Sequence, residues 1–272
     1  MPEEIYVHPN ERMNGTSVDR DGDLSTSFGQ NADIYDAYRP NYASEAIDLI
    51  ASRGHRMVLD VGCGTGILGK QLSMHGVSVL GVEPDERMAS TARVNGLSVE
   101  VSRFEDWDSE GRLFDAVVSG QAWHWVDPSQ GQEKLTRVLR PQGEVFLVWN
   151  IGSMQVGVMN SLDHIYREHG LEHLDAFSVI LGRGETSRFE SCFESLRADP
   201  AFKSVLKNEW VWRRDYSTDE WLMHLLTHPE HGALGAVERQ SLFADLRTSI
   251  DELHAGKVQM EYKTLVIWAG MF

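Results

Sequence analysis

Two acidic residues stand at the ends of neighbouring apolar runs, with a glycine-rich turn between them. The first run, residues 57–61, contains Asp60 and opens into a turn with Gly62, Gly64 and Gly66, and the second, from residue 77, ends in Glu83. Glycine backbone can approach a ligand closely because it has no Cβ. A carboxylate at the end of the second run can accept hydrogen bonds from both hydroxyls of a ribose. The pattern predicts a nucleoside-binding site at the ends of two parallel strands.

Two classes of cofactor are compatible with this pattern. Gly64, Gly66 and Gly69 have the spacing of a dinucleotide fingerprint, which would bind a nicotinamide cofactor in an oxidoreductase. Asp60, however, would then place a carboxylate beside the pyrophosphate, and like charges repel. S-adenosylmethionine carries no phosphate, and its sulfonium and ammonium groups tolerate a nearby acid. The residues favour S-adenosylmethionine and leave the nicotinamide-dependent oxidoreductase as the alternative.

The elements that must position these residues alternate between strand and helix as far as residue 150. The expected strands cover residues 57–61, 77–82, 97–102, 113–119 and 144–149, with helices at 67–75, 85–95 and 129–139. Such alternation is typical of a doubly wound α/β sheet, in which ligands bind beyond the carboxyl ends of the strands. Later in the chain, strands are expected at 206–216 and 257–268, with helices between them.

Several segments resemble the class I S-adenosylmethionine-dependent methyltransferases. The resemblance is carried by Val58–Gly66, Gly81–Asp85 and Phe114–Ser119. Two more segments, Ile34–Tyr42 and Gln121–Asp127, are similar to a small-molecule branch with trans-aconitate methyltransferase-like and ubiquinone-biosynthesis methyltransferase-like enzymes. The resemblance implies a Rossmann-like seven-stranded sheet whose last strand is antiparallel, with a helical cap insertion. It implies a methyltransferase but does not name the acceptor, because one fold hosts many sites.

The chain is expected to divide into four regions. Residues 1–27 form a polar N-terminal tail, and residues 28–150 form the core that binds S-adenosylmethionine. Residues 151–205 form an insertion that caps the substrate, and residues 206–272 return to the core sheet with further helices.

The resemblance also implies which residues hold the methyl donor. Glu83 would bind the ribose, Asp60 would support the glycine turn and the amino group of the donor, and Arg39 would reach its carboxylate. Arg103 stands where the family often has an acid, so the adenine contact is assigned to Phe104 and Glu105 instead. The complete expected set is Tyr35, Tyr38, Arg39, Asp60, Gly62, Gly64, Glu83, Pro84, Met88, Phe104, Glu105, Ser119 and Gln121.

The acceptor side is expected at Trp123, His124 and Trp125, where two aromatic rings flank an imidazole. His124 is a candidate general base. Acceptors that are already anionic need no base, and proximity and desolvation would then supply most of the rate. No set of His, Asp or Glu has convincing metal-ligand spacing, so we expect a metal-independent reaction.

Composition limits the partners. The formal net charge of −16 disfavours nucleic acid and anionic membranes, which leaves a small-molecule acceptor. The two cysteines give no disulfide framework, and neither a signal peptide nor a membrane-length apolar run is visible, so a cytoplasmic location is expected. A domain that binds the donor only to regulate a partner is the non-enzymatic alternative.

Overall fold

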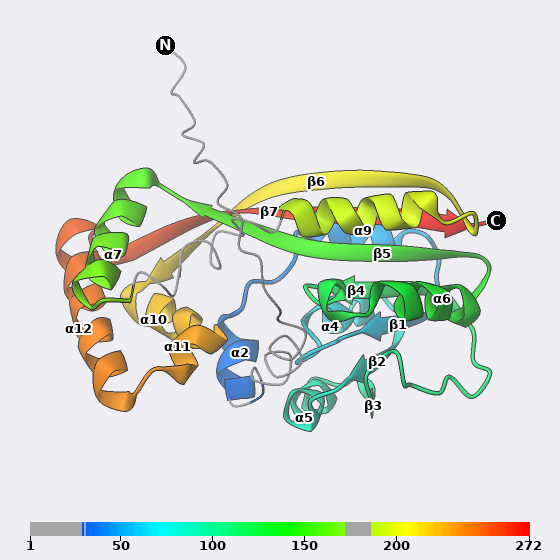
Figure 1. The fold of residues 1–272 in the computed structure, drawn as a ribbon, viewed down its shortest axis with the longest axis horizontal. Helices are drawn as coiled ribbons and strands as arrows, with labels where there is room; N and C mark the ends of the chain where they lie inside the picture. Colours follow the sequence, from blue (N-terminus) through cyan, green and yellow to red (C-terminus); the bar gives the residue numbers. More distant parts are fainter. Residues whose placement is uncertain (1–28, 30, 172–185) are drawn as a thin grey trace, which may run out of the picture.

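The computed structural model describes residue 29 and residues 31–171 and 186–272, which build one seven-stranded mixed sheet (Figure 1). The strand order is β3-β2-β1-β4-β5-β7-β6. The strands are β1 (Met57–Val61), β2 (Ser78–Glu83), β3 (Ser98–Val101), β4 (Phe114–Gly120), β5 (Leu139–Met154), β6 (Phe202–Ser217) and β7 (Lys257–Met271). The first five pair in parallel, and β7 lies antiparallel between β5 and β6. The predicted fold class is confirmed.

The parallel half of the sheet is apolar because helices cover both of its faces. Four of the five residues of β1 and five of the seven of β4 are buried. The helices of this half are α2 (Ala32–Tyr38), α3 (Ser44–Ala51), α4 (Ile67–Ser73), α5 (Glu86–Val94) and α6 (Pro128–Val138). Asp85 and Asp127 cap α5 and α6 with their side chains, which fixes where these helices begin. All of the strands and helices expected before residue 139 are present within a few residues.

Strand β5 is far longer than the expected 144–149, whereas β6 and β7 exceed the expected strands by only a few residues. β5, β6 and β7 run for 16, 16 and 15 residues, so they project well past the parallel half (Figure 1). Around the projecting ends lie α7 (Val156–Glu168), α10 (Thr218–Leu226), α11 (Pro229–Ala233) and α12 (Ala236–Leu253). These helices bury a second apolar cluster that includes Leu162, Trp221, Leu246 and Tyr262. The molecule therefore has a second core beside that of the sheet.

The segment expected to form the cap divides between these two cores. Helix α9 (Thr186–Ala198) places Phe189 and Leu196 in the sheet core, whereas α7 belongs to the second core. The expected boundary at residue 205 falls inside β6. Residues 1–27 lie outside the described residues, and the division into four regions stays a prediction.

Candidate functional site

The glycine turn after β1 is tied to the end of β2 by Glu83. The backbone N–H of Gly64 donates to Glu83 Oε2 at 2.8 Å, and that of Asp85 donates to Oε1 at 3.0 Å. Gly62 and Gly64 have φ values of 65° and 56°, which glycine adopts without strain. A Cβ on Gly62 would come within 2.5 Å of Ala122 Cβ. The spacing of glycines in the sequence thus serves both the turn and its close approach to the segment after β4.

Asp60 is the most unusual group of the turn. Its side chain is fully buried, and neither carboxylate oxygen accepts a hydrogen bond of ordinary length and angle from any described residue. Burial raises the pKa of Asp60 to about 8; the Gly69 backbone N–H opposes this rise and the Glu83 carboxylate adds to it. Burial likewise raises the pKa of Glu83 to about 7, although the N–H groups of Asp85 and Gly64 act to lower it. No cationic side chain of the described residues forms an ion pair with either buried acid, so the two together would suit a positively charged ligand.

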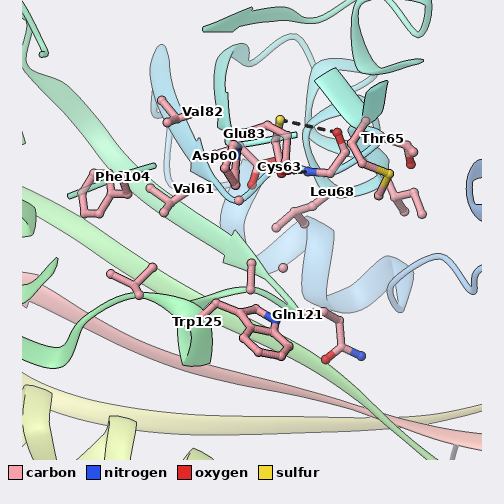
Figure 2. A pocket seen from close by; sticks show the side chains of 18 of the residues that line it. Asp60, Val61, Cys63, Thr65, Leu68, Val82, Glu83, Phe104, Gln121 and Trp125 are labelled. Atoms are coloured by element: carbon pink, nitrogen blue, oxygen red, sulfur yellow. Dashed lines mark hydrogen bonds between the residues drawn. The ribbon is translucent and has the colours of Figure 1, made fainter. Parts of the chain in front are cut away.

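These acids line a cavity with about 990 Å³ of empty space, solvent at its mouth included. Figure 2 shows Asp60 and Glu83 on one side of this space, with Gln121 and Trp125 facing them from the other. The expected site residues that line it are Tyr35, Asp60, Gly62, Gly64, Glu83, Pro84, Met88, Phe104, Glu105, Gln121 and Trp125.

Five other expected residues do not line the cavity. The Ser119 hydroxyl is buried and donates to Val61 O at 2.8 Å, which joins β4 to β1. Trp123 is buried in the sheet core. His124 lies beside Trp149, whose Nε1–H donates to His124 Nδ1 at 3.5 Å. Tyr38 accepts a hydrogen bond at its carbonyl from His224, and Arg39 donates to Thr227 O at 3.2 Å.

The end of the cavity expected to hold adenine has an apolar wall and a glutamate that already accepts a hydrogen bond from the protein. Met88 and Phe104 are both buried and line the cavity. Glu105 accepts a hydrogen bond from the Asp127 backbone N–H at 2.7 Å, so one of its oxygens already secures the start of α6. Arg103 lies 4.0 Å from the other oxygen and also lines the cavity.

Sequence reasoning missed several cavity-lining residues. Tyr42 lies within a segment singled out for its resemblance, but its own role was not assigned. Thr65 is buried, and its hydroxyl has no hydrogen-bond partner among the described residues. No sequence pattern predicts the main chain of Gln121, whose φ of 56° is unusual for a residue other than glycine. The additional lining residues are Tyr42, Val61, Cys63, Thr65, Ile67, Leu68, Val82, Arg103, Gly120, Ala122 and Val126.

Among residues 29, 31–171 and 186–272, no group of three or more His, Cys, Asp or Glu side chains is arranged to hold a metal ion. No helix in the same ranges is both long and apolar enough to cross a membrane.

Comparison with known proteins identifies a methyltransferase domain in this chain. Residues 59–147 match the family model of the methyltransferase domain. An uncharacterized methyltransferase of Mycobacterium tuberculosis is 38% identical over 151 residues, which cover 54% of this chain and 62% of that protein. A ubiquinone biosynthesis O-methyltransferase of Hahella chejuensis is 34% identical over 108 residues, or 37% of this chain and 45% of that protein. The matches thus span less than two thirds of these relatives.

The fold agrees with this assignment. The structure of a candidate type II methyltransferase from Anaeromyxobacter dehalogenans aligns with a TM-score of 0.61 at 22% identity, over 86% of this chain and 98% of that one. Residues 59–147 therefore form a methyltransferase domain, as the resemblance of the glycine turn and Glu83 implied.

Proposed function

We propose that this protein transfers the methyl group of S-adenosylmethionine to a nucleophilic atom of a small-molecule acceptor, without a metal ion. The observation that carries the proposal is the buried Asp60 carboxylate next to Glu83 in the cavity wall, which has no hydrogen-bond partner among the described residues. A cationic ligand would satisfy Asp60, whereas the pyrophosphate of a nicotinamide cofactor would be repelled by it. Among the described residues that line the cavity, one side chain is cationic, Arg103, and three are acids, Asp60, Glu83 and Glu105.

The cavity residues suggest how the donor would be held. Glu83 would accept the ribose hydroxyls, and Met88 and Phe104 would enclose the adenine between apolar side chains. Asp60 would face the ammonium group of the methionine end, and the Thr65 hydroxyl offers a further hydrogen bond in the same wall. When bound, S-adenosylmethionine supplies a methyl carbon that is already activated by the sulfonium charge.

The protein's own part in the reaction would be to align the acceptor and exclude water. Trp125 and Gln121 face the acids across the cavity and would border the acceptor (Figure 2). The Gln121 side chain donates to Asn150 O at 2.9 Å, which holds this wall in place. The likeness to an enzyme named for ubiquinone biosynthesis and O-methylation supports a small organic acceptor.

Binding measurements test the assignment of the donor. Calorimetry should show S-adenosylhomocysteine binding with 1:1 stoichiometry and no binding of NAD⁺ or NADH. S-adenosylhomocysteine release with a panel of small nucleophiles, in the presence and absence of EDTA, then tests transfer and metal independence. Binding of NAD⁺ without S-adenosylhomocysteine would favour the oxidoreductase alternative, and binding without turnover on any acceptor would favour the regulatory domain.

Donor affinity should fall as the pH is lowered from 7.5 to 5.5. The folded, donor-free protein has Asp60 and Glu83 with pKa values of about 8 and about 7, so acidification protonates both groups. A bound cation and ribose favour the charged carboxylates, so binding must expel these protons. We expect the dissociation constant of S-adenosylhomocysteine to be roughly 10- to 1,000-fold larger at pH 5.5 than at pH 7.5. Calorimetry in two buffers of different ionisation enthalpy measures the released protons; a constant affinity over this range would contradict the role of the acids.

His124→Gln should leave turnover within a few-fold of the wild type. His124 does not line the cavity, and its Nδ1 lies 3.5 Å from the Trp149 Nε1–H that donates to it. The imidazole is therefore not placed where a base would meet an acceptor in the cavity. Kinetics with the acceptor identified in the panel decide the matter: a general base would cost about 10²–10⁴-fold in kcat, and Trp125→Phe serves as a comparison within the cavity wall.

A further inference from the structure

A cluster of arginine and histidine side chains lies beside the donor cavity, where α2 meets the second core. We define the Arg39 cluster as Arg39, Arg214, His224, His228 and His231. Helices α2 and α10 are in contact, and Figure 1 shows α11 and α2 next to each other below the projecting strands. Arg214 Nη1 donates to the Arg39 carbonyl at 3.3 Å, and the His224 and His228 rings lie 5.1 Å apart. The cluster therefore joins the segment after α2 to β6, α10 and α11.

Several hydrogen-bonding atoms of this cluster are buried without a partner. Within the described residues, these atoms are Arg39 Nε, His228 Nε2 and His231 Nδ1. Only 4% of His228 and 1% of His231 is exposed. The Tyr166 hydroxyl lies 2.6 Å from His231 Nε2. If Tyr166 donates this hydrogen bond, the ring proton of a neutral His231 is on Nδ1, which has no partner among the described residues. Buried donors without acceptors are costly, and an anionic ligand would satisfy them.

The positive charge of the two arginines in the Arg39 cluster is not balanced by an ion pair within the described residues. In the part of the chain that the structure describes, neither Arg39 nor Arg214 forms an ion pair with a carboxylate. Glu220 influences Arg214 electrostatically but accepts its hydrogen bond from Ser217. Burial, and then the charge of Arg39, hold the pKa values of His224 and His228 well below the ordinary range, so both are neutral donors. Within the described residues, the two guanidinium groups thus contact carbonyl oxygens and aromatic rings but no carboxylate.

The cluster borders the cavity through two tyrosines. The Arg39 guanidinium carbon lies 5.0 Å from the centre of the Tyr35 ring, and Tyr35 lines the cavity. Tyr42 lines it as well, and both Asp60 and Arg39 influence its pKa. An acceptor that extends from the donor cavity past Tyr35 would therefore approach the Arg39 guanidinium.

We propose that the Arg39 cluster binds a carboxylate of the methyl acceptor, so that the substrate is an organic acid rather than a neutral molecule. The inference rests on the proposed methyltransferase function. Arg39 and Arg214 would supply the charge, because guanidinium groups pair with carboxylates through parallel hydrogen bonds. His228 and His231 would donate to the remaining lone pairs, and Tyr35 would contact the body of the substrate. Arg39 would then serve the acceptor rather than the donor carboxylate that the sequence resemblance implies.

Calorimetry with benzoate, in protein saturated with S-adenosylhomocysteine, tests this site. We expect saturable binding of benzoate and no binding of benzamide, which has nearly the same shape and no charge. Failure of S-adenosylhomocysteine itself to bind would overturn the proposed function, whereas donor binding without benzoate binding would overturn the acceptor site alone. Binding of inorganic phosphate but not benzoate would also overturn a carboxylate site.

Two arginine variants and a matched control locate the benzoate. Arg39→Met and Arg214→Met should each weaken benzoate binding about tenfold or more, while Arg213→Met, next along β6 but exposed and paired with Glu261, should not. His228→Phe provides a variant that leaves both arginines in place and should also weaken binding. Unchanged S-adenosylhomocysteine affinity shows that each variant is folded. Competition between benzoate and S-adenosylhomocysteine, or tenfold weaker donor binding in Arg39→Met with benzoate unaffected, would assign Arg39 to the donor and overturn the proposal.

Discussion

Asp60→Asn will stabilise the donor-free protein at pH 8 relative to the wild type, and it will weaken binding of S-adenosylhomocysteine. Both effects have one cause. The Asp60 carboxylate is fully buried, and neither of its oxygens has a hydrogen-bond partner in the part of the chain that the structure describes. The donor-free protein therefore carries an unfavourable charge or an unusual proton at this position. The donor relieves this state when its ammonium group arrives. An amide at residue 60 removes the charge, and with it the attraction to the donor.

The dependence on pH follows from the direction of the shift. The pKa of Asp60 is about 8 in the folded protein and about 3.9 in an unfolded chain. The folded state therefore holds its proton more tightly, and this contribution to stability is full below pH 4 and is lost as the pH rises through 8. The lost contribution is on the order of several kcal/mol. Asparagine does not titrate, so the variant should lack this part of the pH dependence.

Thermal unfolding from pH 5 to pH 8.5 measures the effect. The melting temperature of the donor-free wild type should fall over this range by more than that of Asp60→Asn. S-adenosylhomocysteine should bind the variant about 10- to 100-fold more weakly at pH 8, as expected for loss of a hydrogen bond to a charged group. A variant that is less stable than the wild type at pH 8, or that binds the donor equally well, would refute this account.

Asp115→Asn is a matched control at the opposite end of the sheet. Burial acts to raise the pKa of Asp115, but the backbone N–H groups of Met57 and Arg56 and the Arg140 guanidinium outweigh it, and the pKa is lowered. The charged form of Asp115 is thus favoured by folding, and its stabilisation is present at neutral pH and lost on acidification. The same substitution should destabilise the protein here and leave donor affinity unchanged.

The parallel half of the fold could be predicted because local pattern and tertiary role coincide there. Buried parallel strands are apolar on both faces, so β1 and β4 appear as continuous apolar runs bounded by glycine turns. The full lengths of β5, β6 and β7 were harder to predict. Along β6 exposed and half-buried residues alternate over most of its length, and its pairing with β7 begins at Phe202, before the expected start at residue 206. The length of such a strand depends on its partner, which the pattern of one segment does not reveal.

The residues of the site likewise fall into those that the sequence predicted and those that it did not. Asp60, Gly62, Gly64 and Glu83 were predicted and do line the cavity, because their places in a strand–turn–helix unit determine where they lie. Trp123 and Trp125 were treated alike, yet the short helical turn at Trp123–Trp125 buries the first and turns the second into the cavity. The Arg39 cluster could not be predicted at all. It requires α10 and α11, from the last quarter of the chain, to pack against the segment after α2.

Glu83→Ala will weaken binding of S-adenosylhomocysteine by roughly 1–3 kcal/mol, or about 5- to 150-fold. Glu83 ends β2 with its carboxylate in the cavity, and it is the group best placed to accept the hydroxyls of a ribose. The same oxygens accept the backbone N–H groups of Gly64 and Asp85. The variant therefore loses direct contacts with the donor and also part of the support for the glycine turn.

The fold should survive this change, because the buried charge of Glu83 is itself unfavourable. Its pKa is raised to about 7, so burial outweighs the two N–H donors near neutral pH, and removal of the carboxylate has opposing effects on stability. Glu83→Gln separates the two roles, because it keeps one acceptor for the turn and loses the charge. Glu86→Ala, on the exposed side of α5 where Glu86 pairs with Arg93, is the control and should bind the donor normally. Equal donor affinity in Glu83→Ala and Glu86→Ala would show that the ribose lies elsewhere, and the nucleoside site deduced from the glycine turn would then be wrong.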